Sequence, residues 1–243
     1  HFFEHLMFKQ TSTHPDGEFD RLLESAGAEG ENAFTSRDYT AYVQSMPKDK
    51  LELIVGLEAD RMVNLLVVDE SIKPEREVVQ NERRFRYENS PSGLMYEKVY
   101  ELAYKRHAYK WPVIGYEKDL NNAQRKDFEA FYKRFYAPNN ATVIVVGDVD
   151  PDSTVRLIER HYGKLPASKI DRIASPAEPA QTEERVETLK IKTPVEKLVV
   201  GYHIPDVKQA DFAALEAARQ ILSGGKGSRL YRKLVDGGIA TSV

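Results

Sequence analysis

The chain has 243 residues, of which 41% are hydrophobic and 30% charged, with 35 Lys and Arg against 38 Asp and Glu and a formal net charge of −3. This near balance argues against a nucleic acid or an anionic membrane as the main partner, and no apolar run approaches the roughly 20 residues that a membrane helix needs. The sequence contains no cysteine, which excludes disulfides, thiolate metal sites and a cysteine nucleophile. Any metal must therefore be held by histidine and carboxylate side chains.

Hydrophobic periodicity and turn residues predict alternating helices and strands along the chain. In chain order they are a buried helix in 1–9, a short helix over 19–27, one or two strands in 32–47, a helix over 48–63, a helix beginning near Pro74 and running to Glu88, an amphipathic helix over 120–138, a buried strand over 140–149, a helix over 151–162, a strand over 197–204 and a helix over 209–222.

This order of elements predicts an α+β fold in which helices pack on one face of a mixed or antiparallel sheet. We expect a first domain over 1–166, a linker over 167–184 and the start of a second, similar domain over 185–243. The linker is rich in proline, alanine and charge and shows no periodicity. We also expect the chain to be part of a longer protein, with a strand region missing before the first domain and the second domain cut short.

The first five residues, HFFEH, place two histidines four positions apart with a carboxylate between them. On a helix His1 and His5 lie on one face, one turn apart, so both can bind one metal ion. Glu4 lies about 60° to one side of them, where a general base for a metal-bound water would stand. Zinc suits these ligands, but a catalytic zinc takes three protein ligands, so the motif predicts a third one elsewhere.

The helix expected after Pro74 offers that ligand. Its apolar stripe is marked by Val78, Val79 and Phe85. Glu82 falls in the middle of the stripe, and Glu75 lies on the same face two turns earlier. Carboxylates on a buried face are costly unless they are paired or bind a metal, whereas Glu77 falls off the stripe and is expected in solvent. The pattern therefore selects Glu82 and Glu75 as candidates.

The HxxEH motif resembles the inverted zinc motif of the pitrilysin/insulinase family of metallopeptidases, the inverzincins. That family places its glutamate ligand some 76 residues after the second histidine, and 76 residues lie between His5 and Glu82. Further likenesses are the segments NAFTSRDYTAY, YAPNNATVIVVGDVDP and LSGGKGSRLYRKL. The chain is thus similar to the zinc-bearing chain of a bacterial processing-peptidase-like enzyme.

The resemblance implies a role for each matching residue. His1, His5 and Glu82 would bind Zn²⁺, Glu4 would be the catalytic base, and Glu75 would orient or tune the site. Asn32, Ala33, Phe34 and Thr35 would bind the substrate as an added β-strand. The implied activity is endopeptidase cleavage of unfolded peptides inside a closed chamber formed by two halves.

One segment departs from the family pattern. Members that act alone carry an Arg and a Tyr in their second domain, where this chain has Val235 and Thr241. The resemblance therefore implies either a heteromeric enzyme, in which a paralogous partner subunit supplies the pair, or a fused tandem.

Other interpretations remain open at this point. The chain could be a non-catalytic or partner-dependent peptidase-like subunit of a heteromeric complex. His1 and His5 could be plain helix residues, and Glu75 could form a structural ion pair with Arg86 or another arginine. The GGKGS segment over 224–228 does not match a phosphate loop and is better explained as the turn that ends a helix.

Overall fold

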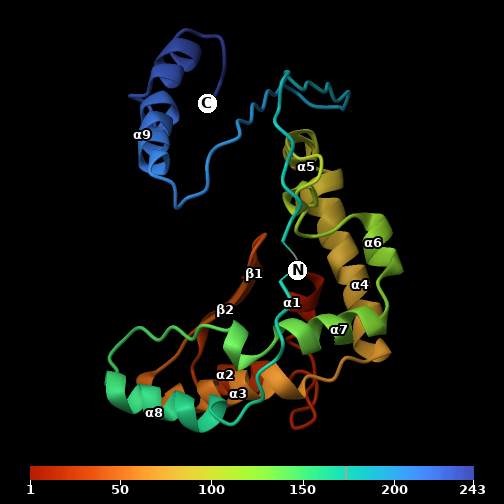
Figure 1. Ribbon diagram of the computed structural model, residues 1–243, viewed down its shortest axis with the longest axis vertical. Coiled ribbons are helices and arrows are strands. Elements are labelled where there is room, and N and C mark those ends of the chain that lie inside the picture. Colours follow the sequence, from red (N-terminus) through yellow and green to blue (C-terminus); the bar gives the residue numbers. More distant parts are fainter. Residues whose placement is uncertain (173) are drawn as a thin grey trace. The chain divides into compact units, whose positions relative to one another are not determined.

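Helices dominate the computed structural model, which describes residues 1–172 and 174–243 (Figure 1). The chain divides into two units, His1–Lys197 and Leu198–Val243. The α-helices of the first unit are α1 Phe2–Leu6, α2 Glu18–Ser25, α3 Leu51–Asn64, α4 Asp69–Arg83, α5 Pro91–Ala103, α6 Glu117–Asn122, α7 Arg125–Phe135 and α8 Pro151–Tyr162, and its strands are β1 Glu29–Thr35 and β2 Thr40–Ser45. The second unit holds α9 Asp211–Ser223 and a π-helical turn, Tyr231–Val235. Helices with a small antiparallel sheet confirm the predicted α+β class.

The strands β1 and β2 form an antiparallel hairpin, in agreement with the strands expected in 32–47. Thr35 pairs with Thr40 at the tip of the hairpin, and Asn32 pairs with Val43 further along. An irregularity in the register lies between Glu29 and Asn32. Within the described residues these are the only two strands of the sheet, so each has one edge without a hydrogen-bonded neighbour.

The short helix α1 is held by its apolar side chains. Phe2, Phe3, Leu6 and Met7 are all buried in one cluster with residues of α4 and α7. The ring of Phe2 meets that of Phe128 edge to face at 4.7 Å. Five residues cannot form a stable helix alone, so this packing fixes where α1 lies and how it is rotated.

A buried arginine connects α1 to the hairpin and to α3. Arg61 is 1% exposed and pairs with Glu58 of the same helix. It also donates to the backbone carbonyl of Met7 at 3.4 Å, and its guanidinium lies over the ring of Tyr42 at 4.5 Å. The charge is thus compensated by a carboxylate and by ring faces, which makes burial of the arginine tolerable.

Two expected strands are not found. Residues 141–149 follow the 3₁₀ turn Pro138–Asn140 and contain no helix or strand, and residues 197–204 likewise contain none. The expected burial is also wrong, because Ile144 is 80% and Val146 90% exposed. The apolar composition favours a strand, but a strand forms only beside a partner, and no described residue pairs with either segment.

The helix α4 begins earlier than expected. It starts at Asp69, so Pro74 lies inside it rather than in its first turn. Its buried residues are Ile72, Glu75, Val79, Gln80 and Arg83. The expected stripe was wrong at two of its three positions, because Val78 and Phe85 are exposed. Glu75 therefore lies on the buried face, and Glu82 lies at its edge.

The expected linker, 167–184, contains no helix or strand in its described part. Polar contacts nevertheless attach it to other parts of the first unit, to which it belongs. The backbone N–H of Ser168 donates to Asn139, and the Glu178 carboxylate accepts the backbone N–H groups of Lys105, Arg106 and His107. Burial opposes charge on Glu178, but these three donors outweigh it and lower its pKa to about 2.

No helix among the described residues combines the length and the apolar character that crossing a membrane requires.

The loop that follows α1 is attached to α3 through one carboxylate. Asp60 accepts hydrogen bonds from Thr11 at 2.6 Å, Thr13 at 2.7 Å, Asn64 at 2.7 Å and His14 at 3.1 Å. Burial raises the pKa of Asp60, but these hydrogen bonds outweigh it and hold the pKa below its ordinary value. The ionised carboxylate therefore stabilises the folded chain.

We expect Asp60→Asn to lower the free energy of unfolding at neutral pH by about 1–3 kcal/mol, because one of the two oxygens that accept from these four donors becomes an NH₂ group. The pKa of Asp60 is depressed on folding, so its contribution is complete above the unfolded pKa near ~4 and is lost as the pH falls through the folded pKa. Urea unfolding at neutral pH and at pH ~3 should show the two proteins converging at low pH. Asp49→Asn, at a side chain that is 68% exposed, is the control. Equal stability of Asp60→Asn and wild type at neutral pH would contradict this account.

Candidate metal centre

The two histidines of the first five residues lie on the side of α1 that the core leaves uncovered. Their ring centroids are 4.8 Å apart, as expected for positions i and i+4. The buried residues Phe2, Phe3 and Leu6 fix the rotation of the helix. His1 and His5 consequently face α4, the neighbouring helix in the core.

The structure brings Glu82 of α4 to both histidines. His1 Nε2 lies 3.4 Å from Glu82 Oε1, and His5 Nε2 lies 3.4 Å from Glu82 Oε2. One ligand atom from each of the three residues lies within 4.8 Å of the others. In the part of the chain that the structure describes, this is the one such group of His, Asp or Glu side chains that could hold a metal ion.

The donor set fits zinc in spacing. Ligands at about 2.0–2.1 Å in a tetrahedron lie roughly 3.3–3.4 Å from one another, and each histidine nitrogen lies at this distance from one of the two oxygens of Glu82. Two histidines and one carboxylate leave a fourth position for water or substrate. His1 Nδ1 is buried without a hydrogen-bond partner, so this ring has less support than that of His5.

Glu75 fixes the ring of His5. Its Oε1 accepts from His5 Nδ1 at 2.8 Å, and its Oε2 accepts from Lys9 Nζ at 2.8 Å. Burial raises the pKa of Glu75, but the hydrogen bonds from His5 and Lys9 outweigh it and lower the pKa. The proton of His5 therefore lies on Nδ1, and the Nε2 lone pair faces Glu82.

The alternative role of Glu75, a structural ion pair with an arginine, is not found. No described arginine pairs with Glu75, and Arg86 pairs instead with Glu82 at 2.9 Å.

Glu4 is buried beside the two histidines. Glu4 is 7% exposed, and its Oε2 accepts a hydrogen bond from the hydroxyl of Thr35. The Glu4 carboxylate therefore lies on the side of the site that faces the hairpin, whereas Glu82 lies on the side formed by α4.

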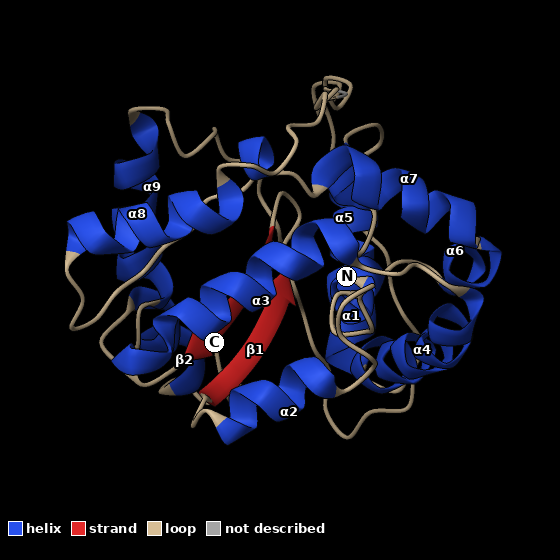
Figure 2. Ribbon diagram, turned by 90° about the horizontal axis from the view of Figure 1, so that it is seen from below, coloured by secondary structure: helices blue, strands red, loops and turns tan. Residues whose placement is uncertain are grey.

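The predicted substrate strand lies against α1, which carries the two histidines, since β1 contacts α1 (Figure 2). Its four predicted residues differ in what their side chains do. Thr35 turns to Glu4, Asn32 accepts the backbone N–H of Ala33 at 2.9 Å, and Phe34 is half exposed.

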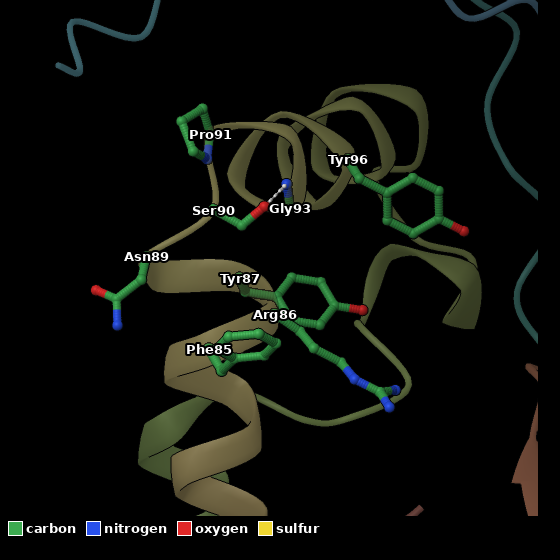
Figure 3. Close-up of a pocket in the computed structure, with 8 residues that line it drawn as sticks. All are labelled: Phe85, Arg86, Tyr87, Asn89, Ser90, Pro91, Gly93 and Tyr96. Atoms are coloured by element: carbon green, nitrogen blue, oxygen red, sulfur yellow. Dashed lines mark hydrogen bonds between the residues drawn. The ribbon is translucent and has the colours of Figure 1, made fainter. Parts of the chain in front are cut away.

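A hollow of about 620 Å³, which the sequence did not indicate, lies beyond Glu82. It forms where α4 changes into a π-helical turn, Arg84–Glu88, and it is lined by Phe85, Arg86, Tyr87 and Tyr96 among others (Figure 3). The turn rotates Phe85 away from the core, so that this residue is 79% exposed. No hydrophobic pattern distinguishes a π turn from the end of an α-helix, so sequence reasoning could not detect it.

Two family models match the chain. Residues 1–117 match the model described as insulinase (peptidase family M16), and residues 122–243 match the peptidase M16 inactive domain. The chain belongs to peptidase family M16. The matched residues of the M16 peptidase model include all members of the candidate metal centre.

Similar proteins include the zinc protease PqqE of Helicobacter pylori, 36% identical over 97% of this chain and 54% of that protein. An uncharacterised zinc protease of Mycobacterium leprae, ML0855, is 30% identical over 100% of this chain and 55% of that protein. The chain thus spans about half the length of these curated relatives.

Solved structures agree with this assignment. A protease from Helicobacter pylori superimposes with a TM-score of 0.86 and 34% identity, covering 98% of this chain and 58% of that one. The first half of the periplasmic protease PqqL from Escherichia coli gives a TM-score of 0.65 and 27% identity over 75% of this chain and 40% of that one. The α+β fold and the assignment to a family of zinc proteases therefore agree with the site geometry.

We expect Glu82→Gln to weaken zinc binding by about 100-fold or more, because it replaces a charged ligand, and Glu75→Gln to weaken it by about 10–100-fold. Competition with a chromophoric zinc chelator measures both affinities. Glu77→Gln, at an exposed position of the same helix, should bind zinc as wild type does. Unchanged affinity in Glu82→Gln would exclude this residue as a ligand.

Proposed function

We propose that this chain contains the catalytic zinc site of an endopeptidase that hydrolyses unfolded peptides. The observation that carries the proposal is the convergence of His1, His5 and Glu82, with Glu4 buried beside them. A catalytic zinc site needs three protein ligands, an open position and a general base, and this set offers each of them.

Each residue has a separate task in the proposed reaction. Zinc, when bound, supplies the Lewis acid that polarises the scissile carbonyl and acidifies water. Glu4 accepts the proton of the attacking water and returns it to the leaving amine. Glu75 keeps the ring of His5 in the tautomer that leaves Nε2 available, and Lys9 compensates the charge of Glu75.

The free edge of the hairpin supports strand addition as the mode of substrate binding. Within the described residues β1 pairs only with β2, and it lies against α1. An extended peptide added to β1 would gain backbone hydrogen bonds irrespective of its side chains. In the full-length protein we propose that a chamber closed by two halves restricts access to unfolded segments.

The segment around Val235 supports a partner-dependent enzyme as the second candidate. Val235 and Thr241 occupy the positions where self-sufficient relatives would carry Arg and Tyr, and neither residue can donate as an arginine or tyrosine does. A paralogous subunit would then supply both donors to the bound peptide.

The central test is Glu4→Gln in the full-length protein. We expect this variant to retain zinc and to lose about 10²–10⁴-fold in kcat on a quenched fluorescent peptide, because glutamine cannot accept the proton. Zinc content by atomic absorption is measured on the same sample. Glu77→Gln is the matched control. Activity retained in Glu4→Gln would refute the proposed function.

Dependence on a partner gives a second test. The full-length protein alone should cleave the quenched peptide slowly, and addition of a paralogous subunit that contains the Arg and Tyr should raise the rate at least about 10-fold. A full rate without the partner would exclude this candidate, and the effect should vanish when the Arg of the added subunit is replaced by Ala.

A further inference from the structure

The carboxylate of Glu4 has few partners for a buried group. Apart from the Thr35 hydroxyl, no hydrogen bond or ion pair to its side chain is found within residues 1–172 and 174–243. A buried ionised carboxylate without donors is strongly disfavoured. The hydroxyl of Thr35 is thus what holds this carboxylate in place, and it binds Oε2 while Oε1 stays unoccupied by protein.

The direction of the hydrogen bonds follows from proton counting. A threonine hydroxyl has one proton to donate, and an ionised carboxylate can only accept. Thr35 therefore donates to Glu4, and its oxygen must accept from Thr40, whose Oγ1 lies 3.0 Å away. Thr35 and Thr40 are also paired in the register of the hairpin. The two hydroxyls form a chain, Thr40 to Thr35 to Glu4, in which each bond polarises the next.

The geometry of β1 allows the Thr35 side chain to hold Glu4 without using the strand edge proposed to bind the peptide. Successive side chains of a strand point to opposite faces, so Thr35 can reach Glu4 while the backbone edge of β1 stays open. The resemblance to known peptidases implied that Thr35 binds substrate, but its hydroxyl is already engaged by Glu4. Loss of the hydroxyl should then disturb the carboxylate without removing a contact to the peptide.

We propose that Thr35, supported by Thr40, is a positioning residue that orients the Glu4 carboxylate, so that Oε2 is held and Oε1 is presented to water. This inference rests on the proposed function of Glu4 as the base. It also makes the tip of the hairpin part of the catalytic apparatus, because the strand offered to the peptide is the one that holds the base.

The test compares Thr35→Val with Thr35→Ser in the full-length, zinc-loaded protein. Valine keeps the shape of threonine and lacks the hydroxyl, whereas serine keeps the hydroxyl. We expect Thr35→Val to lower kcat about 10–100-fold with KM within about twofold of wild type, and Thr35→Ser to stay within about threefold. Thr40→Val should lower kcat by a smaller factor. A raised KM with unchanged kcat in Thr35→Val would show a substrate contact instead and overturn the proposal.

A double-variant cycle separates positioning from a general structural effect. If Thr35 acts through Glu4, adding Thr35→Val to Glu4→Gln should lower the residual kcat by less than about twofold. Independent, multiplicative losses would refute the coupling. Failure of Thr35→Ser to restore kcat would equally refute a role for the hydroxyl. An active, zinc-loaded Glu4→Gln would instead show that the proposed function itself has failed.

Discussion

The site depends on the burial of one face of α1. Four apolar side chains, Phe2, Phe3, Leu6 and Met7, occupy the core between α4 and α7. A helix of five residues has no stability of its own, so its orientation is set entirely by this packing. The polar residues of α1 consequently face two different neighbours. The histidines face α4, and Glu4 faces the hairpin.

The electrostatics of the site follow from the same arrangement. Carboxylates from α1 and α4 lie close together, and each is balanced by a different group. Glu75 accepts from His5 and Lys9, Glu82 forms an ion pair with Arg86, and Glu4 accepts from the Thr35 hydroxyl. Within the described residues Glu4 forms no ion pair with a lysine or arginine, which leaves its carboxylate available for the proposed role as a base.

The sequence predicted which side chains the structure brings together at α1 better than it predicted the sheet. The spacing of His1 and His5 determines their proximity on any helix, and the distance along the chain to Glu82 was informative through the resemblance. The physical argument for Glu82 was partly wrong, because Val78 and Phe85 are exposed and Glu82 lies at the edge of the buried face. The strands expected over 140–149 and 197–204 failed because pairing depends on a partner that local composition cannot specify. The π turn after α4 and the hydroxyl chain to Glu4 have no sequence pattern of their own.

The anchoring of the segment after α8 has a consequence for self-cleavage. An enzyme that recognises peptides by their extended backbone must keep its own irregular segments from acting as substrates. Glu178 is held by three backbone N–H groups, and Arg185 donates to the carbonyls of Leu102 and Ala103. Such contacts fix the backbone without a helix or strand, and a fixed backbone cannot straighten to add to a sheet edge. In the proposed endopeptidase, polar side-chain anchors rather than regular secondary structure would protect this segment from autolysis.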